Sequence, residues 1–156
     1  MVFLRAMSEK EFPNYCQYFI EDYSQEIAKN YGHSLAHATR LAEEDLQRCF
    51  PHGLESNEHT LLCIDADIDG TATLAGYLWH SVNLKERSTF IYDFYIFPKC
   101  RSHGIGKQAI AALEHQLQAE SISQIKLRVA YHNERALKLY KEVGFVITGF
   151  NVAKEI

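Results

Sequence analysis

Two short segments carry groups that could take part in chemistry. The first is Arg101-Ser-His-Gly-Ile-Gly-Lys107, a glycine-rich turn between a strand-like run (89–97) and an amphipathic helical pattern (108–120). Such a turn gathers unpaired backbone N–H groups and the positive end of the helix dipole at one place, which suits a phosphate or pyrophosphate. Glycine lets a bulky anion approach the amides because it has no Cβ. The turn therefore predicts an anion site at a helix start.

Spacing separates three motifs that share this composition. A P-loop needs Gly at 101 and Ser or Thr at 108, where the chain has Arg101 and Gln108. A dinucleotide fingerprint beginning at Gly104 lies too far from the strand end, and Val129 stands where the ribose-binding acid is expected. The third pattern, Arg/Gln-x-x-Gly-x-Gly/Ala after a strand, resembles the acyl-CoA pyrophosphate loop of the GNAT superfamily of N-acyltransferases.

The second segment runs from Asn133 to Phe145. Asn133 suits a helix N-cap, and Gly144 suits the left-handed position that ends a helix. Seven residues at 3.6 per turn place Asn133 and Tyr140 about 20° apart on one face, about 10 Å along the axis. A capped amphipathic helix packed on a sheet accounts for its leucines, but not for this alignment of Asn and Tyr behind an anion site.

The pattern Asn-x-x-Ala-x-x-x-Tyr-x-x-x-Gly-Phe resembles the second conserved block of GNAT enzymes. It is formed here by Asn133, Ala136, Tyr140, Gly144 and Phe145. Because the two blocks occur in the family's order, separated by a helix and a strand, the chain is identified as a member of the superfamily. The resemblance extends essentially from end to end.

The elements expected along the chain agree with that fold. Hydrophobic periodicity and turn residues predict the order β-α-α-β-β-β-α-β-α-β, with Ser8-Glu-Lys-Glu11 as a capping box that opens the first helix. The expected ranges are strands at 2–6, 60–64, 74–82, 89–96, 124–129 and 145–152, and helices at 8–29, 34–50, 104–120 and 133–143. We expect an α/β (α+β) fold: a mixed, mostly antiparallel GNAT-type sheet of six to seven strands, with helices on both faces, in one acyltransferase domain spanning 1–156.

Composition limits the partners and the compartment. The formal net charge is −4 over 156 residues, so there is no basic excess that would favour nucleic acid. The four cysteines show neither a C-x-x-C pair nor zinc spacing. The N-terminus becomes charged too early for a signal peptide, and no apolar run is long enough to span a bilayer. We expect a cytoplasmic protein with free thiols, and neither a membrane nor nucleic acid as partner.

The resemblance implies acetyl-CoA as cosubstrate, held between the splayed strands at 89–96 and 124–129. Pantetheine would bond the backbone near Phe94 and Ile96, and Asn133 would steady its arm. The pyrophosphate would sit on the turn, whose implied contacts are Arg101, Ser102, His103, Gly104, Ile105, Gly106 and Lys107. Two departures leave the loop contacts open, because the family usually has Gly at Ser102 and Lys, Arg or Gln at His103.

The implied reaction is direct attack of a neutral amine on the thioester in a ternary complex. Tyr140 would assist the leaving thiolate, by a hydrogen bond or by proton transfer. Asp93 is the first candidate for the general base because it is the only carboxylate in its aromatic strand, although holding a loop or pairing with a cation is an equal alternative. His80 is a second candidate. Cys100 lies close to the loop but in no recognisable Cys/His arrangement.

The acceptor is a primary amine on a small molecule, a polyamine or a protein. Acidic groups on the first two helices most often form a solvated face, but the resemblance places this region beside the acceptor groove. The candidates for contacting the acceptor are Glu21, Asp22, Tyr23, Tyr31 and His80. The alternative function is a non-catalytic acyl-CoA-binding sensor, which needs the loop but no hydroxyl at the sulfur. A homodimer is common in the family but has no signature in this sequence.

No metal site is predicted. The run 65–70 imitates half of a calcium loop, but its twelfth position would be Gly76 rather than Glu, and strands flank it. His33 and His37 have i, i+4 spacing without an adjacent Glu or a third ligand.

Overall fold

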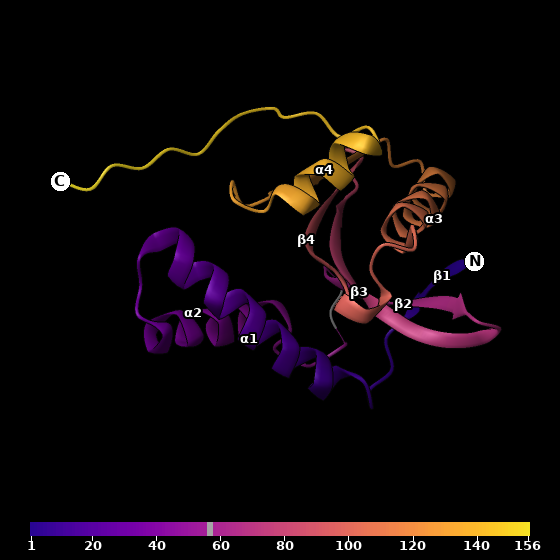
Figure 1. The fold of residues 1–156 in the computed structure, drawn as a ribbon, viewed down its shortest axis with the longest axis horizontal. Helices are drawn as coiled ribbons and strands as arrows, with labels where there is room; N and C mark the ends of the chain where they lie inside the picture. Colours follow the sequence, from indigo (N-terminus) through magenta and orange to yellow (C-terminus); the bar gives the residue numbers. More distant parts are fainter. Residues whose placement is uncertain (56–57) are drawn as a thin grey trace.

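The computed structural model describes residues 1–55 and 58–156. The elements of this part of the chain (Figure 1) are, in order, β1 (Val2–Ala6), α1 (Phe12–Tyr31), α2 (Leu35–Cys49), β2 (Thr60–Ile68), β3 (Thr71–Asn83), β4 (Ser88–Ile96), the 3₁₀ helix η1 (Pro98–Cys100), α3 (Ile105–Ala119), β5 (Gln124–Leu127) and α4 (Glu134–Glu142). Among these residues no helix is long and apolar enough to cross a membrane.

The strands form one sheet in the order β1-β2-β3-β4-β5. Neighbours among the first four run antiparallel, and β5 runs parallel to β4. Short turns join β2 to β3 and β3 to β4, as antiparallel pairing permits, whereas the parallel step from β4 to β5 passes through α3 as a crossover. The predicted mixed, mostly antiparallel sheet is therefore confirmed.

Residues of β2 alternate between two cores on opposite faces of the sheet. Leu62 and Ile64 pack with side chains of α3 such as Leu113. Leu61 and Cys63 pack instead with aromatic and aliphatic side chains of α1 and α2. Successive strand residues point to opposite faces, so this alternation lets the sheet carry a helical layer on each side. Figure 1 shows α1 and α2 on one side and α3 and α4 on the other, which confirms the expected layers.

The start of α1 differs from the prediction. The helix begins at Phe12 with Glu11 as its N-cap, not at Ser8. The Ser8–Glu11 pair does form, since the Ser8 N–H donates to Glu11 Oε1 at 3.0 Å. The Glu11 carboxylate is also held by Arg5 of β1 at 2.9 Å. Through Glu11, these bonds connect the turn before α1 to strand β1. The capping-box pattern therefore identified the correct turn, but the helix begins at Phe12 rather than directly after Ser8.

The strand count is also different. In the described residues the sheet has five strands rather than six to seven, and β5 ends at Leu127 rather than Val129. The run 145–152, predicted as a final strand, is drawn out but joins no ladder (Figure 1). Strand-forming residues adopt a strand only where a neighbouring strand completes their backbone hydrogen bonds. The sequence pattern cannot say where that neighbour lies.

β4 and β5 are paired over only part of their length, which creates the opening that the site needs. Their ladder ends at Ile91. At the same place Trp79 pairs with Asp93 while His80 pairs with Ile91, so Tyr92 is an extra residue in a β-bulge. A bulge bends its strand and increases the local twist. Beyond Ile91, the edge of β4 that faces β5 is therefore not paired with it.

Candidate active site

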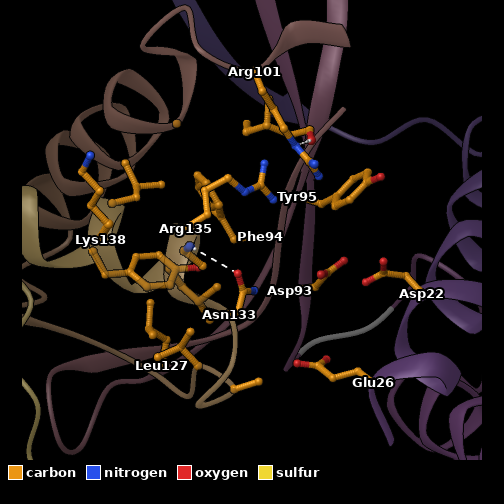
Figure 2. A pocket seen from close by; sticks show the side chains of 18 of the residues that line it. Asp22, Glu26, Asp93, Phe94, Tyr95, Arg101, Leu127, Asn133, Arg135 and Lys138 are labelled. Carbon is orange, nitrogen blue, oxygen red and sulfur yellow. Dashed lines mark hydrogen bonds between the residues drawn. The ribbon is translucent and has the colours of Figure 1, made fainter. Parts of the chain in front are cut away.

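A cavity of about 870 Å³ lies beside that free edge of β4. Its lining comes from residues 91–96 of β4, the turn before α3, the residues after β5, and α4, with α1 opposite (Figure 2). The volume lies within the range of pockets that hold small molecules and cofactors. The splayed pair of strands expected from the sequence is thus present, and we call this cavity the groove.

One end of the groove is the start of α3. Gly104 is the N-cap, in the left-handed conformation with φ of 74°, and no side chain caps the helix. The first amides of α3 are therefore not used by a capping side chain, and they carry the positive end of the helix dipole. Arg101 fixes the turn, because its Nε donates to the Ile96 carbonyl at 2.8 Å and its guanidinium lies 5.2 Å from the Tyr95 ring centre.

Two residues of the turn show why small side chains suit it. A Cβ at Gly106 would lie 3.0 Å from Leu139 Cδ2, so glycine allows α4 to pack closely against α3. Ser102 has φ of 66°, in the left-handed region that favours glycine. The position where the resemblance expects Gly is therefore one where serine carries backbone strain.

Of the expected cations, Arg101 lines this end of the groove, and two further cations that were not expected line it as well. Lys107 lines the groove, but its Nζ is 2.8 Å from Glu142 Oε2 of α4. His103 lies outside the lining and borders a second, smaller cavity of about 320 Å³ beside the N-terminus. Arg135 and Lys138 of α4 line the groove instead (Figure 2). Sequence reasoning missed both. Their i, i+3 spacing places Arg135 and Lys138 on one helix face, but that face is not the one shared by Asn133 and Tyr140.

Helix α4 has the ends that the sequence predicts. The Asn133 side chain accepts from the Ala136 N–H at 3.3 Å. At the other end the Gly144 N–H donates to the Lys141 carbonyl and the Phe145 N–H to the Tyr140 carbonyl, with Gly144 at φ of 103°. This pair of bonds is a Schellman motif. Both cap predictions are confirmed, and together they fix where the helix side chains meet the groove.

Tyr140 lines the groove from α4 and is 8% exposed. Its ring lies edge-on to Phe94 of β4, at 6.4 Å between centres, and to Phe145 at 5.4 Å. Burial, with the negative charges of Asp93 and Glu26, raises the pKa of Tyr140 to about 12. The hydroxyl therefore stays protonated at neutral pH and can donate a hydrogen bond into the groove.

Asp93 faces the groove from β4 and accepts two hydrogen bonds from α1. The Tyr15 hydroxyl donates to Oδ2 at 2.9 Å, and the Tyr18 hydroxyl donates to Oδ1 at 3.2 Å. Burial raises the pKa of Asp93 to about 7, the charges of Asp22 and Glu26 also raise it, and the tyrosine bonds oppose the rise. A carboxyl group with this pKa can exchange a proton near neutral pH.

Sequence reasoning missed Tyr15 and Tyr18, the two tyrosines whose hydroxyls donate to Asp93. Tyr15 and Tyr18 lie on one face of α1, a spacing that indicates only a stripe packed against the core. Both indeed pack on Tyr77 of the sheet. Nothing in the local sequence says that their hydroxyls reach a carboxylate more than 70 residues away along the chain.

The other end of the groove is acidic. Asp22 and Glu26, one turn apart on α1, point toward Asp93 in Figure 2. Burial raises the pKa of both carboxyls. For Glu26 the charge of Asp22 adds to the rise, and Arg128 and His132 on the opposite wall oppose it. Three carboxyl groups thus face one space, where a cation would relieve their mutual repulsion.

The remaining acceptor candidates lie outside the lining of the groove. Glu21 accepts from the Gln17 side chain at 3.3 Å on the exposed face of α1. Tyr23 packs on Phe19, and Tyr31 is exposed at the end of the helix.

His80 is buried among the strands, with Nδ1 2.8 Å from Thr89 Oγ1, and burial lowers its pKa to about 4. It does not line the groove, which leaves Asp93 as the better placed of the two candidate bases.

The cysteines are free thiols, as expected, with Cys63 and Cys100 buried. Cys100 lines the groove, but its side chain is 2% exposed and packs in the core next to α3. In the described part of the chain no cluster of three or more His, Cys, Asp or Glu residues is arranged to hold a metal ion.

The fold and the groove can be compared with known proteins. YycN of Bacillus subtilis, an uncharacterized N-acetyltransferase, is 29% identical over 99% of this chain and 99% of its own length. Its crystal structure aligns with a TM-score of 0.91, covering 100% of this chain and 99% of that chain, at 29% identity.

Two further solved structures share the fold at lower identity. PaiA N-acetyltransferase of Thermoplasma acidophilum, in complex with coenzyme A, is 17% identical over 97% of this chain and 93% of that chain, with a TM-score of 0.71. Spermidine N-acetyltransferase of Vibrio cholerae, in complex with CoA and spermine, is 22% identical over 95% of this chain and 82% of that chain, with a TM-score of 0.65.

A family model described as the acetyltransferase (GNAT) family matches residues 14–145, which is most of the chain. With that match and the whole-chain similarity to YycN, the enzyme class predicted from the sequence, an N-acetyltransferase, is confirmed, and the chain belongs to the GNAT family.

Proposed function

We propose that this protein transfers an acetyl group from acetyl-CoA to a primary amine carried by a cationic acceptor. The observation that carries the proposal is the division of one groove into an end that suits anions and an end lined by carboxyl groups. The first end suits the phosphates of CoA and the second suits a protonated amine. The relatives solved with CoA, and with CoA and spermine, support the same pairing of ligands by analogy.

The cosubstrate would lie with its pyrophosphate on the first amides of α3. The cations Arg101, Arg135 and Lys138 line that end and would neutralise its charge. The pantetheine arm would follow the free edge of β4 past Phe94 and Ile96, with Asn133 on the other side. The Ile96 carbonyl already accepts one bond from Arg101, so a pantetheine amide would use its second lone pair.

The chemistry divides between two groups that face the groove. The amine nitrogen attacks the thioester carbon, a C–N bond forms and the C–S bond breaks, and a proton leaves the amine. Asp93, with its pKa raised to about 7, accepts that proton directly or through a water molecule. The Tyr15 and Tyr18 hydroxyls hold the carboxylate in place, so the base is positioned before the substrate arrives.

Tyr140 would stabilise the leaving sulfur by donating a hydrogen bond rather than its proton. With a pKa of about 12 for this phenol and about 8.5 for a thiol, complete transfer is uphill by about 5 kcal/mol. A hydrogen bond to the developing thiolate needs no such transfer, and a single well-placed donor can supply a hundredfold in rate. The sensor alternative gives this buried donor and the Asp93 carboxyl no role.

The test is thiol release from acetyl-CoA across amines of graded charge: polyamines, diamines, a monoamine, glutamate, and a peptide with a free lysine. We expect turnover, with kcat/KM rising with positive charge on the acceptor. An absence of turnover on every amine, with acetyl-CoA still bound, would favour the sensor. A preference for glutamate would contradict the acidic end as acceptor site.

Neighbouring residues on α1 provide a matched control for the acceptor. Asp22→Asn removes a charge from the groove, and we expect the KM for a diamine to rise about tenfold, which corresponds to about 1.4 kcal/mol. Glu21→Gln removes a carboxylate next in sequence that lies outside the lining, and it should leave that KM within twofold. Equal effects of the two changes would mean that only net charge matters.

A further inference from the structure

The acidic end of the groove is lined by basic side chains as well as by carboxyl groups. Arg128 and His132, in the segment between β5 and α4, line the groove together with Glu26 of α1. In Figure 2, Glu26 and Leu127, the last residue of β5, both lie below Asp93. Both signs of charge therefore meet at this end, whereas an acceptor with ammonium groups alone would need only the carboxyl groups.

Arg128 and Glu26 act on each other across a gap. Burial and the charge of Asp22 raise the pKa of the Glu26 carboxyl, whereas the charges of Arg128 and His132 lower it. Among the described residues, however, Arg128 takes part in no direct ion pair. The guanidinium and the carboxyl group thus interact without touching, and both line the same cavity. A ligand with one charge of each sign would fill the space between them.

Two other cations that line the groove are placed differently. The Nε of Arg101 donates to the Ile96 carbonyl at 2.8 Å, which ties that side chain to the other end of the groove. Lys29 follows Glu26 by one turn of α1, so it shares the wall of that carboxyl group instead of facing it. A guanidinium also presents a planar fork of donors that matches both oxygens of a carboxylate, which an ammonium group does not. Arg128 therefore has the position and the shape to bind a carboxylate opposite Glu26.

We propose that the acceptor is a free α-amino acid that carries a second amino group on its side chain. An α-amino acid holds an ammonium group and a carboxylate on one carbon atom. Its head can therefore face Glu26 with the ammonium group and Arg128 with the carboxylate, while its side chain extends toward Asp93. The proposal rests on the acetyl transfer proposed above and specifies the acceptor of that reaction.

The reaction takes place at the side-chain nitrogen. The neutral side-chain amine attacks the thioester carbon, a C–N bond forms, the C–S bond breaks, and CoA leaves as the thiolate. The proton lost by the amine passes to Asp93, as in the proposed function. The α-ammonium group keeps its protons because the carboxyl groups of α1 stabilise its charged form. The product therefore carries the acetyl group on the side chain, and its α-ammonium group and carboxylate are unchanged.

Matched substrates separate the effect of the carboxylate from that of the two amines. L-Lysine is cadaverine with a carboxylate on one terminal carbon, and L-ornithine is related to putrescine in the same way. For at least one pair we expect kcat/KM to be about 30-fold higher with the amino acid, which corresponds to about 2 kcal/mol. Nα-acetyl-lysine amide, which lacks both charges of the head, should be a poor acceptor. Fragmentation mass spectrometry should find the acetyl group on the side-chain nitrogen.

Variants of Arg128 test the residue that binds the carboxylate. In Arg128→Gln, kcat/KM for the amino acid should fall about 30-fold while that for its diamine stays within about twofold, so the preference disappears. Arg128→Glu should reverse the preference, because it places a carboxylate opposite a carboxylate. Lys126→Gln, two residues earlier and outside the lining, is the matched control and should keep the preference. The Kd for CoA, measured by calorimetry, should stay the same in all three variants.

The outcomes distinguish the choice of acceptor from the acetyl transfer itself. Turnover of a diamine by each variant shows that the variant is folded and that the reaction is intact. Diamines that are used as well as the amino acids, or acetylation of the α-nitrogen, would overturn the proposed acceptor and leave the acetyl transfer standing. So would an Arg128→Gln variant that keeps the preference, or one that loses activity equally on both substrates. An absence of turnover on every amine, with acetyl-CoA still bound, would overturn both.

Discussion

The two ends of the groove are built in different ways. The anion end comes from two compact segments, 101–107 and 133–138, in which a helix start and its neighbours supply nearly everything. The acidic end joins Asp22 and Glu26 of α1 to Asp93 of β4, with two tyrosines of α1 holding the Asp93 carboxyl.

That difference follows from the role that we propose for each end. An anion is bound by backbone amides and a helix dipole, which exist wherever a helix begins without a capping side chain. A proton acceptor near pH 7 needs a carboxyl group taken out of water and placed beside other charges. Burial and neighbouring charge come from distant parts of the chain. The first end can therefore be recognised locally, and the second cannot.

The largest effect is expected at the acidic end. Asp93→Asn keeps an acceptor for the tyrosine hydroxyls but cannot take a proton. We expect kcat/KM for the amine to fall about 1,000-fold, the order associated with loss of a general base, and the acidic limb of the pH–rate profile to disappear. Binding of CoA, measured by calorimetry, should change less than twofold. A variant that retains the limb would show that another group is the base.

The second-largest effect is expected for Tyr140, which lies between the two ends of the groove. Tyr140→Phe removes only the hydroxyl, and its ring contacts with Phe94 and Phe145 remain. We expect kcat to fall about 100-fold, as for loss of one donor to a developing anion, while the KM for acetyl-CoA stays within twofold. Steady-state kinetics with both substrates varied measures this. An unchanged kcat would remove Tyr140 from the mechanism.

The anion end should give a smaller effect that appears in binding rather than turnover. Lys138→Gln takes a cation out of the groove lining, and we expect the Kd for CoA to rise about fivefold, which corresponds to about 1 kcal/mol. Raising the salt concentration should shrink the difference. Lys141→Gln, on the same helix but outside the lining, is the matched control and should change nothing. Equal losses would assign the effect to net charge.

The smallest expected effect is a shift in the pKa of Asp93, which two variants should move in opposite directions. The base acts when deprotonated, so kcat/KM should fall below a pH of about 7. Tyr18→Phe removes a bond that lowers this pKa, and the acidic limb should move up by about half a unit. Asp22→Asn removes a charge that raises it, and the limb should move down by a similar amount. Using one amine throughout cancels the contribution of the substrate, and shifts of the same sign would contradict the assignment.

The predictions from sequence succeeded for features set by neighbouring residues, such as helix caps. They were incomplete for features that need a distant strand or a distant charged side chain. The caps Asn133 and Gly144 and the start of α3 were identified from residue types and their spacing, and the mixed sheet from the order of the expected elements and the resemblance to the family. Residues 145–152 were predicted as a strand of the sheet, yet among the described residues they pair with no other strand. The cations were predicted only in part. The expected Arg101 and Lys107 line the groove, although Lys107 is paired with Glu142, and Arg135 and Lys138 of α4 line it as well.

The sequence by itself determined the class of enzyme and the helix start that we propose as the anion site. Both depend on residue types at fixed spacings along single helices and turns, where geometry is set by the backbone. Only the tertiary structure decided which carboxyl group has its pKa raised to about 7, which tyrosines hold it, and which acidic residues of α1 face the groove. Those properties depend on removal from water and on charges brought together by packing, and packing joins residues that the order of the chain keeps apart.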